Sequence, residues 1–119
     1  MARGELWAID FEPQTHREEP GKPGRPALVM QSDALNSVGH GTTIVVPGTS
    51  RLAPGDGGDL FPLRVRLGAG SRTGLRVDTD LLIDQVRAVS NQRLLKRLGV
   101  ASNDEIERAQ AALGLLMSR

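Results

Sequence analysis

Hydrophobic and polar residues alternate along most of the first ninety or so positions, in short runs broken by glycine and proline. Alternation with a period of two is typical of strands that bury one face. The expected strands cover residues 5–11, 26–31, 42–46, 63–67, 75–78, 80–84 and 86–89. Between the second and third, Ser32 and Asp33 are expected to cap one helical turn that runs to Asn36. Several short strands at such close spacing favour a compact β-barrel.

Prolines and glycines set the expected ends of these strands. Pro26 stands first in its strand, where a residue without an N–H group interrupts no hydrogen-bond ladder. Pro47, followed by Gly48, is expected to end the strand at residues 42–46. Proline, glycine and polar residues dominate residues 13–24 and 52–61, which are expected to form exposed loops.

The run Leu-Arg-Val-Arg-Leu at residues 63–67 alternates more cleanly than any other. A strand with this pattern places its apolar side chains on one face and its polar side chains on the other. We expect the leucines and the valine to be buried, and Arg64 and Arg66 to be exposed to solvent.

Beyond residue 90 the pattern changes from alternation to helical spacing. Ser90 is expected to cap a helix over residues 91–98 that stops at Gly99. Ser102, with Glu105 three positions later, forms the pattern of a capping box for a second helix. Its apolar face is expected to pack in the core or between two copies of the chain; the residues of this face are Ile106, Ala109, Leu113, Leu116 and Met117.

Length and composition limit the class of protein. With 119 residues, of which 39% are hydrophobic, the chain is expected to be a single domain over residues 1–119 whose burial a second copy completes. The absence of cysteine excludes disulfides, thiol nucleophiles and cysteine-ligated zinc. No segment approaches the roughly 20 apolar residues that span a bilayer, and the first residues contain no apolar signal core. We therefore expect a soluble, cytoplasmic homodimer that does not contact a membrane.

The net charge of +1 hides an uneven distribution. Residues 1–20 carry two arginines against five acidic residues, whereas residues 85–101 carry four basic residues and no acidic one. Arginine makes up thirteen of the fifteen basic residues. Because a guanidinium binds phosphate with two parallel hydrogen bonds, local contact with a polyanion remains open despite the low net charge.

Motifs for several chemistries are missing. The sequence contains no HExxH pair, and His16 and His40 are far apart, so no metal site is expected. Nor does it contain a phosphate-binding loop, a dinucleotide fingerprint or a nucleophile elbow, so no cofactor is expected. Cleavage of RNA needs neither, because the 2′-hydroxyl of the substrate can attack the adjacent phosphorus. A protein then has to orient the attack, move two protons and stabilise charge.

Short runs in a characteristic order carry a resemblance that extends over nearly the whole chain. They are Arg-Gly-Glu-Leu-Trp at residues 3–7, Gly-Arg-Pro-Ala-Leu-Val-Met at 24–30, Val-Val-Pro-Gly-Thr-Ser at 45–50 and Ile-Asp-Gln-Val-Arg at 83–87. Together they resemble the MazF/PemK family of toxin endoribonucleases from type II toxin–antitoxin systems. The resemblance implies a mainly β, α+β fold: a small half-open β-barrel of the CcdB/PemK type with a C-terminal helix.

The resemblance also implies an activity and a catalytic pair. It points to a metal-independent, sequence-specific endoribonuclease that cleaves single-stranded RNA by 2′-hydroxyl attack and leaves a 2′,3′-cyclic phosphate and a 5′-hydroxyl. Arg25 matches the arginine that serves at the scissile phosphate, and Thr49 matches a hydroxyl that donates to a phosphoryl oxygen. A turn-capping role for Thr49 stays open. A cognate antitoxin with an acidic tail is the implied partner, and the basic residues at 85–101 are a complementary surface for it.

Five residues are candidates for binding the substrate: His16, Glu18, Ser50, Asp84 and Gln85. Ser50 extends the family's hydroxyl position, and Asp84 with Gln85 matches an acidic–glutamine pair that contacts bases. Glu18, like Glu19, offers an acceptor for base amino groups, with a solvated loop carboxylate as the alternative. His16 and Asp84 are the candidates for a general base, and a solvated loop histidine is an equally open interpretation of His16. Leu82 stands where PemK-like members have an arginine, which favours a MazF-like scheme centred on Arg25 and Thr49.

Two other functions remain open. A toxin of the same fold, like the CcdB group, acts by binding DNA gyrase and needs no arginine at a phosphate. A non-catalytic nucleic-acid-binding barrel is the third possibility, but the chain has only Trp7, Phe11 and Phe61 as aromatic residues for base stacking.

Overall fold

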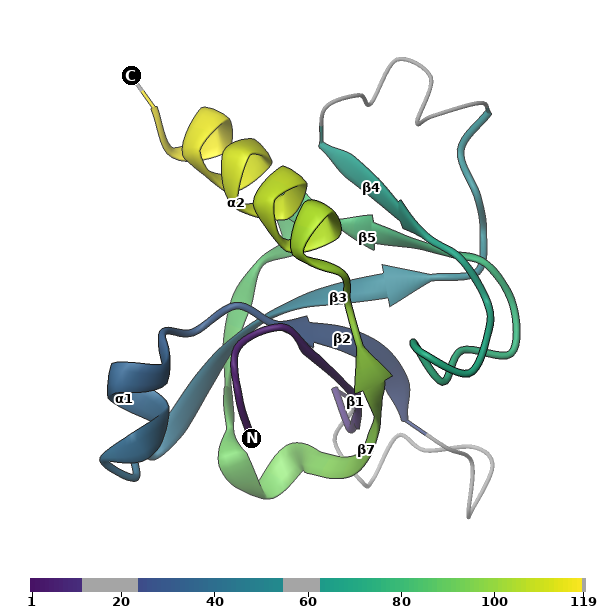
Figure 1. Cartoon of the computed structure of the whole chain (residues 1–119). Helices are drawn as coiled ribbons and strands as arrows, with labels where there is room; N and C mark the ends of the chain where they lie inside the picture. Colours follow the sequence, from purple (N-terminus) through teal and green to yellow (C-terminus); the bar gives the residue numbers. More distant parts are fainter. Residues whose placement is uncertain (12–23, 55–62, 119) are drawn as a thin grey trace.

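The structure is a computed structural model that describes residues 1–11, 24–54 and 63–118 (Figure 1). Within these ranges seven strands form one antiparallel sheet in the order β4-β5-β3-β2-β1-β7, with β6 paired to β3. The strands are β1 (Glu5–Ile9), β2 (Arg25–Val29), β3 (Thr42–Thr49), β4 (Arg64–Leu67), β5 (Thr79–Leu82), β6 (Arg87–Ser90) and β7 (Leu94–Val100). The helices are α1 (Asp33–Ser37) and α2 (Asn103–Met117), and two 3₁₀ turns are η3 (Ile83–Gln85) and η4 (Asn91–Arg93).

Strand β3 organises the sheet because it contacts three partners. One edge pairs with β2, while the other pairs with β6 over its first half and with β5 at Gly48 and Thr49. The prediction that Pro47 ends this strand is wrong. On the edge shared by β6 and β5, the pairing with β6 stops at Val45 and the pairing with β5 starts at Gly48. Pro47 therefore falls where the partner changes, and its missing N–H interrupts no ladder on that edge.

The sheet has a hydrophobic cluster on each face. In β2, Leu28 belongs to the larger cluster, and Ala27 and Val29 belong to the smaller one. Strands β1, β2, β3, β6 and β7 surround the smaller cluster, whereas α2, β4 and β5 cover the larger one (Figure 1). The sheet curls but does not close on itself, which confirms the half-open barrel with a C-terminal helix.

Helix α2 has the predicted capping box. The Ser102 hydroxyl accepts from the Glu105 N–H, and the Glu105 carboxylate accepts from the Ser102 N–H. The buried residues of α2 are Ala109 and Ala112, with Ile106 and Leu113 packed against the larger cluster. Leu116 and Met117 were expected on this face, but both are exposed and neither packs against the larger cluster. No helix in the described ranges is long and apolar enough to cross a membrane.

Residues 91–98 do not form the predicted helix. Ser90 does act as a cap, since its side chain accepts from the Gln92 N–H, but only one 3₁₀ turn follows. The chain then enters β7, which pairs with β1. Most of residues 91–98 are good helix formers, but the open edge of β1 supplies backbone partners that a surface helix would leave unused, so strand pairing overrides the local preference.

Two further expectations are corrected. Residues 75–78 do not form a strand; Leu75 makes only a single bridge, to Gly70, after a turn. The strand expected at residues 80–84 spans 79–82 and passes into η3. The helical turn after Ser32 is confirmed as α1.

Candidate active site

Neighbouring strands bring Arg25 and Thr49 together. Ala27 of β2 pairs with Pro47 of β3, and continuing this register by two residues sets Arg25 opposite Thr49. The Nη2 atom of Arg25 donates a hydrogen bond to the Gly48 carbonyl oxygen, 3.2 Å away. A guanidinium has five N–H donors, so this bond leaves others for a ligand. The side chain of Arg25 is exposed, and the group is therefore tethered to β3 yet accessible.

Glycines before each of these two residues allow the strands to approach. A Cβ atom on Gly24 would lie 2.5 Å from the carbonyl oxygen of Ile9, which no real side chain tolerates. A Cβ atom on Gly48 would lie 2.6 Å from Cγ2 of Thr79. Glycine is thus required at position 24 by the neighbouring backbone, whereas at position 48 a larger residue would meet the buried side chain of Thr79. Arg25 and Thr49 are held on backbone that packs tightly against the strands on either side.

The hydroxyl of Thr49 has one hydrogen bond in the described structure. Its Oγ1 atom accepts from the backbone N–H of Arg51 at 3.2 Å, which is the turn-capping contact that the sequence left open. A hydroxyl that accepts one bond keeps its own hydrogen as a donor. Capping the turn and donating to a phosphoryl oxygen are therefore compatible. Ser50 follows directly and is exposed.

Arg87 joins this pair, although the sequence assigned it only to a surface for the antitoxin. It pairs with Val45 across β3 and β6, and so lies on the sheet face of the smaller cluster, as does Arg25. The guanidinium carbons of Arg25 and Arg87 lie 5.6 and 5.2 Å from the centroid of the Phe11 ring. Within the described ranges neither guanidinium has a carboxylate partner. Arg87 and Val89 are two positions apart on one strand and therefore lie on the same face. This spacing is the sequence signal that could have placed Arg87 beside the smaller cluster.

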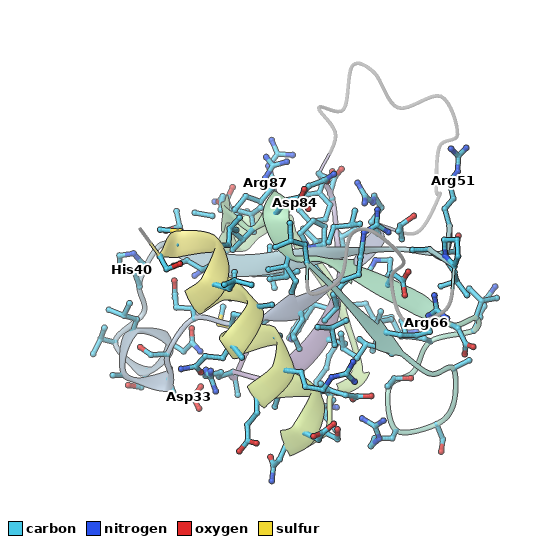
Figure 2. All side chains as sticks on the ribbon, turned by 90° about the horizontal axis from the view of Figure 1, so that it is seen from above. Asp33, His40, Arg51, Arg66, Asp84 and Arg87 are labelled. Carbon is cyan, nitrogen blue, oxygen red and sulfur yellow. The ribbon has the colours of Figure 1, made fainter. Side chains whose placement is uncertain are left out.

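The other predicted substrate-binding residues divide into two groups. Asp84 and Gln85 are exposed on η3, immediately before the strand that carries Arg87. Figure 2 shows Asp84 and Arg87 on the same side of the molecule. His16 and Glu18 lie outside the described residues. Among the residues that are described, no three histidine or acidic side chains are placed to hold a metal ion.

The prediction that Arg64 and Arg66 lie in solvent is wrong. Their side chains are 19% and 30% exposed, and both form ion pairs with Asp80, whose side chain is 1% exposed. The register of β4 and β5 sets Arg66 opposite Asp80. Burial raises the pKa of Asp80, but hydrogen bonds from Arg66 and from the Ala53 N–H, together with the two positive charges, lower the pKa by more. Asp80 is therefore a buried carboxylate with an acidic pKa.

The basic residues at 85–101 make separate contacts. Arg97 forms an ion pair with Glu5, and Arg93 donates to the backbone carbonyl of Asp10. Lys96 is exposed. Since Arg87 lies at the Phe11 ring, these residues contribute to at least three local environments.

Comparisons with known proteins give one consistent result. The model of a family described as PemK-like, MazF-like toxin of type II toxin–antitoxin system matches residues 2–117. The chain is 35% identical to the protein named endoribonuclease MazF9 from Mycobacterium tuberculosis, over 97% of this chain and 94% of that relative. It is 32% identical to the endoribonuclease toxin ChpB of Escherichia coli, over 90% of this chain and 85% of that relative.

Solved structures agree with the sequence relatives. The crystal structure of MazF from Deinococcus radiodurans is similar with a TM-score of 0.72 and 31% identity, over 98% of this chain and 96% of that chain. A crystal structure of MazE–MazF from the same organism is similar with a TM-score of 0.73 and 30% identity, over 99% of this chain and 97% of that chain.

Proposed function

The chain belongs to the family of PemK-like, MazF-like toxins of type II toxin–antitoxin systems, and we propose that it cleaves single-stranded RNA with Arg25 and Thr49 as its catalytic residues. It is an endoribonuclease toxin of that family. Attack by the 2′-hydroxyl of the substrate, without a metal ion, is the mechanism that we propose for it.

One observation carries the proposal. An exposed guanidinium and a hydroxyl with a free hydrogen stand opposite one another on neighbouring strands, joined through the Gly48 carbonyl. A phosphoryl group placed between Arg25 and Thr49 would meet a permanent positive charge and a hydrogen-bond donor. Both stabilise the negative charge that builds up on the phosphoryl oxygens in the transition state. Because the groups are fixed by strand pairing, little reorganisation is needed during the reaction.

The reaction requires no water in the cleavage step. The 2′-oxygen forms a bond to phosphorus as the bond from phosphorus to the 5′-oxygen breaks, which leaves a 2′,3′-cyclic phosphate. The proton of the 2′-hydroxyl passes to a base, and the departing 5′-oxygen takes up a proton. Asp84 and His16 are the candidate bases. Asp84→Asn and His16→Gln variants distinguish them, because only loss of the residue that accepts the proton should lower kcat by the roughly 100- to 10,000-fold that general base catalysis contributes.

The substrate strand extends past the catalytic pair. Arg87 is held at the same Phe11 ring as Arg25, so two cations are available for the RNA backbone. Ser50 directly follows Thr49, and Asp84 and Gln85 precede the strand that carries Arg87; all three are exposed and supply hydrogen-bonding groups for base edges. The sequence specificity of the toxin depends on such contacts with unstacked bases.

A cognate antitoxin is the expected protein partner, as in the MazE–MazF structures of Deinococcus radiodurans. We expect the toxin to act as a homodimer. An acidic antitoxin segment bound near Arg87 would meet positive charge that no carboxylate of the described residues pairs with, and its binding is expected to weaken as salt is added.

The central test uses purified toxin, chelator and a defined RNA. Cleavage is expected to persist in excess chelator, and a single 2′-deoxynucleotide placed 5′ of the scissile phosphate should block it with little effect on binding. Arg25→Ala should abolish most turnover, and Arg25→Lys should restore little, since an ammonium lacks the two-pronged geometry. Thr49→Val, which keeps the shape but removes the donor, should lower kcat by roughly 100- to 1,000-fold.

Other outcomes would point elsewhere. Cleavage of the deoxy-substituted substrate, or loss of activity in chelator, would require a water-activating site instead. Binding of RNA without turnover would indicate a non-catalytic barrel. Toxicity that survives Arg25→Ala, with no RNA cleavage, would favour binding to a protein target such as DNA gyrase.

A further inference from the structure

We propose that Asp80 and Arg66 are positioning residues that hold the end of β3 so that the Thr49 hydroxyl points correctly. This inference rests on the proposed function, because it assigns residues that hold the same site in position. Neither residue touches the substrate in this proposal. Their effect passes through the backbone that follows Thr49.

Asp80 is the cross-strand neighbour of Thr49 in the β3–β5 register. One oxygen of its buried carboxylate, Oδ2, accepts from the backbone N–H of Ala53 at 2.8 Å. Residues 49 and 53 are thus both tied to the same residue of β5, and the chain between them must turn back on itself.

Arg66 completes the attachment. Its Nε atom donates to Asp80 Oδ1 at 2.9 Å, and its Nη2 atom donates to the carbonyl oxygen of Ala53 at 2.5 Å. Asp80 therefore binds the N–H of Ala53 while Arg66 binds its C=O. A single residue in an irregular segment has both backbone polar groups bound by charged side chains, which are themselves paired. We call this arrangement of Asp80, Arg66 and Ala53 the β3-end clamp.

The clamp encloses the contact that orients the hydroxyl. The Arg51 N–H, which Thr49 Oγ1 accepts, belongs to the turn between the two anchored residues. If Ala53 were released, Arg51 could move and the hydroxyl could rotate. A catalytic group must be held to within about 0.5 Å of its working position, and an error of about 1 Å costs roughly 100-fold in rate. Figure 2 shows Arg51 and Arg66 toward the same end of the sheet.

A purely stabilising role fits these contacts less well. Burying a carboxylate and its partners carries a large desolvation cost, so an apolar pair between β4 and β5 would serve stability at least equally. Asp80 and Arg66 also bind the backbone of Ala53, which an apolar pair cannot do. They bind backbone in a segment that has no ladder partner of its own.

The chain provides a matched control for the experiment. Arg72, near the start of α2, forms an ion pair with Glu105 and also donates to the Val100 carbonyl at 3.0 Å. Like Arg66, it joins a carboxylate to a backbone carbonyl, but it lies in a different part of the fold. Arg66→Lys and Arg72→Lys remove the same geometry and keep the charge. Only the first is expected to affect catalysis.

We expect Arg66→Lys to lower kcat by at least tenfold, to leave KM within about twofold, and to speed hydrogen exchange of the Ala53 amide. Arg72→Lys should lower thermal stability without changing kcat. A double-mutant cycle gives the sharpest readout: in a Thr49→Val background, Arg66→Lys should cause almost no further loss, because both changes disable the same hydroxyl. If Arg66→Lys does not fold, Asp80→Asn takes its place. The side-chain oxygen of asparagine can still accept from the Ala53 N–H, but the negative charge that pairs with Arg66 is removed.

Several results would overturn the clamp. Equal losses of kcat in Arg66→Lys and Arg72→Lys would mean that both arginines act only through stability. Additive losses in the double-mutant cycle would mean that Arg66 does not act through Thr49. Unchanged kcat with a freely exchanging Ala53 amide would have the same meaning. By contrast, if the unmodified protein cleaves no RNA under any condition, the proposed function itself fails, and the exchange experiment still reports on the clamp.

Discussion

At the scale of single residues, the site combines two arginines with an aromatic ring. Phe11 lies within cation–π distance of both Arg25 and Arg87 and so helps to hold the two like charges in place. Among the described residues, no carboxylate pairs with either guanidinium. A carboxylate partner would hold the guanidiniums more firmly, but it would also compete with phosphate. The ring therefore positions the cations while leaving their charge available.

This arrangement predicts different roles for the two arginines. Arg87→Ala should raise KM and reduce the dependence of RNA binding on salt, because one phosphate contact on a single strand contributes about 0.7 to the slope of log K against log salt. Its effect on kcat should be small, in contrast to Arg25→Ala. Binding titrations at several salt concentrations, combined with steady-state kinetics, measure both quantities.

Arg76 supplies the control for Arg87. It is an exposed arginine in the segment between β4 and β5, so Arg76→Ala removes the same charge elsewhere on the surface. A loss of salt dependence that is equal in the two variants would show a non-specific effect of net charge. A fall in kcat with unchanged KM in Arg87→Ala would mean that Arg87 acts in catalysis, not in substrate binding.

At the scale of elements, α2 belongs to the protomer core. The sequence left open whether its apolar face packs inside one copy or between two, and Leu113 was a candidate for the dimer interface. In the structure Leu113 packs against the larger cluster of its own chain. Leu113 is partly buried there, so its side chain contributes to the stability of a single copy.

Leu113→Asp is therefore expected to destabilise the fold itself. A carboxylate in this partly buried position lacks a partner, and the change should cost several kcal/mol, with about 2–5 kcal/mol as the usual range for such lesions. Urea unfolding followed by circular dichroism measures the cost. Leu115, which is 56% exposed on the same helix, provides the comparison, and Leu115→Asp should shift the midpoint little. A normal urea midpoint with a changed sedimentation profile in Leu113→Asp would mean that Leu113 lies at the subunit interface.

At the scale of the whole molecule, ion pairs connect elements that are distant in sequence. Glu5 pairs with Arg97, Asp80 with Arg66, and Glu105 with Arg72. For each carboxylate burial raises the pKa, and hydrogen bonds together with the arginine charge lower it by more, so all three pKa values lie below their ordinary ones. These pairs link β1 to β7, β4 to β5, and the turn after β4 to α2.

The lowered pKa values predict acid sensitivity. A carboxylate whose pKa is lower in the folded state stabilises the fold above its unfolded pKa, and the contribution is lost as pH falls through the folded pKa. The unfolded values are about 3.9 for Asp and 4.3 for Glu. The urea midpoint should hence be flat near neutrality and fall steadily below about pH 4.5.

Glu105→Gln tests the assignment. This variant should be less stable than the unmodified protein at pH 7 and should show a shallower loss between pH 4.5 and 3, since one of the linked protons is gone. An identical acid slope in the two proteins would mean that Glu105 does not contribute to the linkage.

Much of this molecule follows from local sequence. Alternation predicted β1 to β6 but not β7, the Ser102–Glu105 pair predicted α2, and the order of short motifs predicted the family and the half-open barrel and made Arg25 and Thr49 the catalytic candidates. The strands and the helix depend on residues that are close in the chain, so local backbone preference and side-chain spacing suffice to predict them. The barrel type and the candidate residues came from the family resemblance.

Only the tertiary structure decided the remainder. Residues 94–100 form a strand instead of a helix because the edge of β1, about ninety positions earlier, offers them backbone partners. Arg64 and Arg66 turn from solvent to Asp80 because β5 pairs alongside β4, and Arg87 reaches Phe11 because β6 pairs with β3. In each case a partner from a distant segment supplies the hydrogen bonds or the charge that outweighs the local preference. Such partners exist only once the sheet has formed.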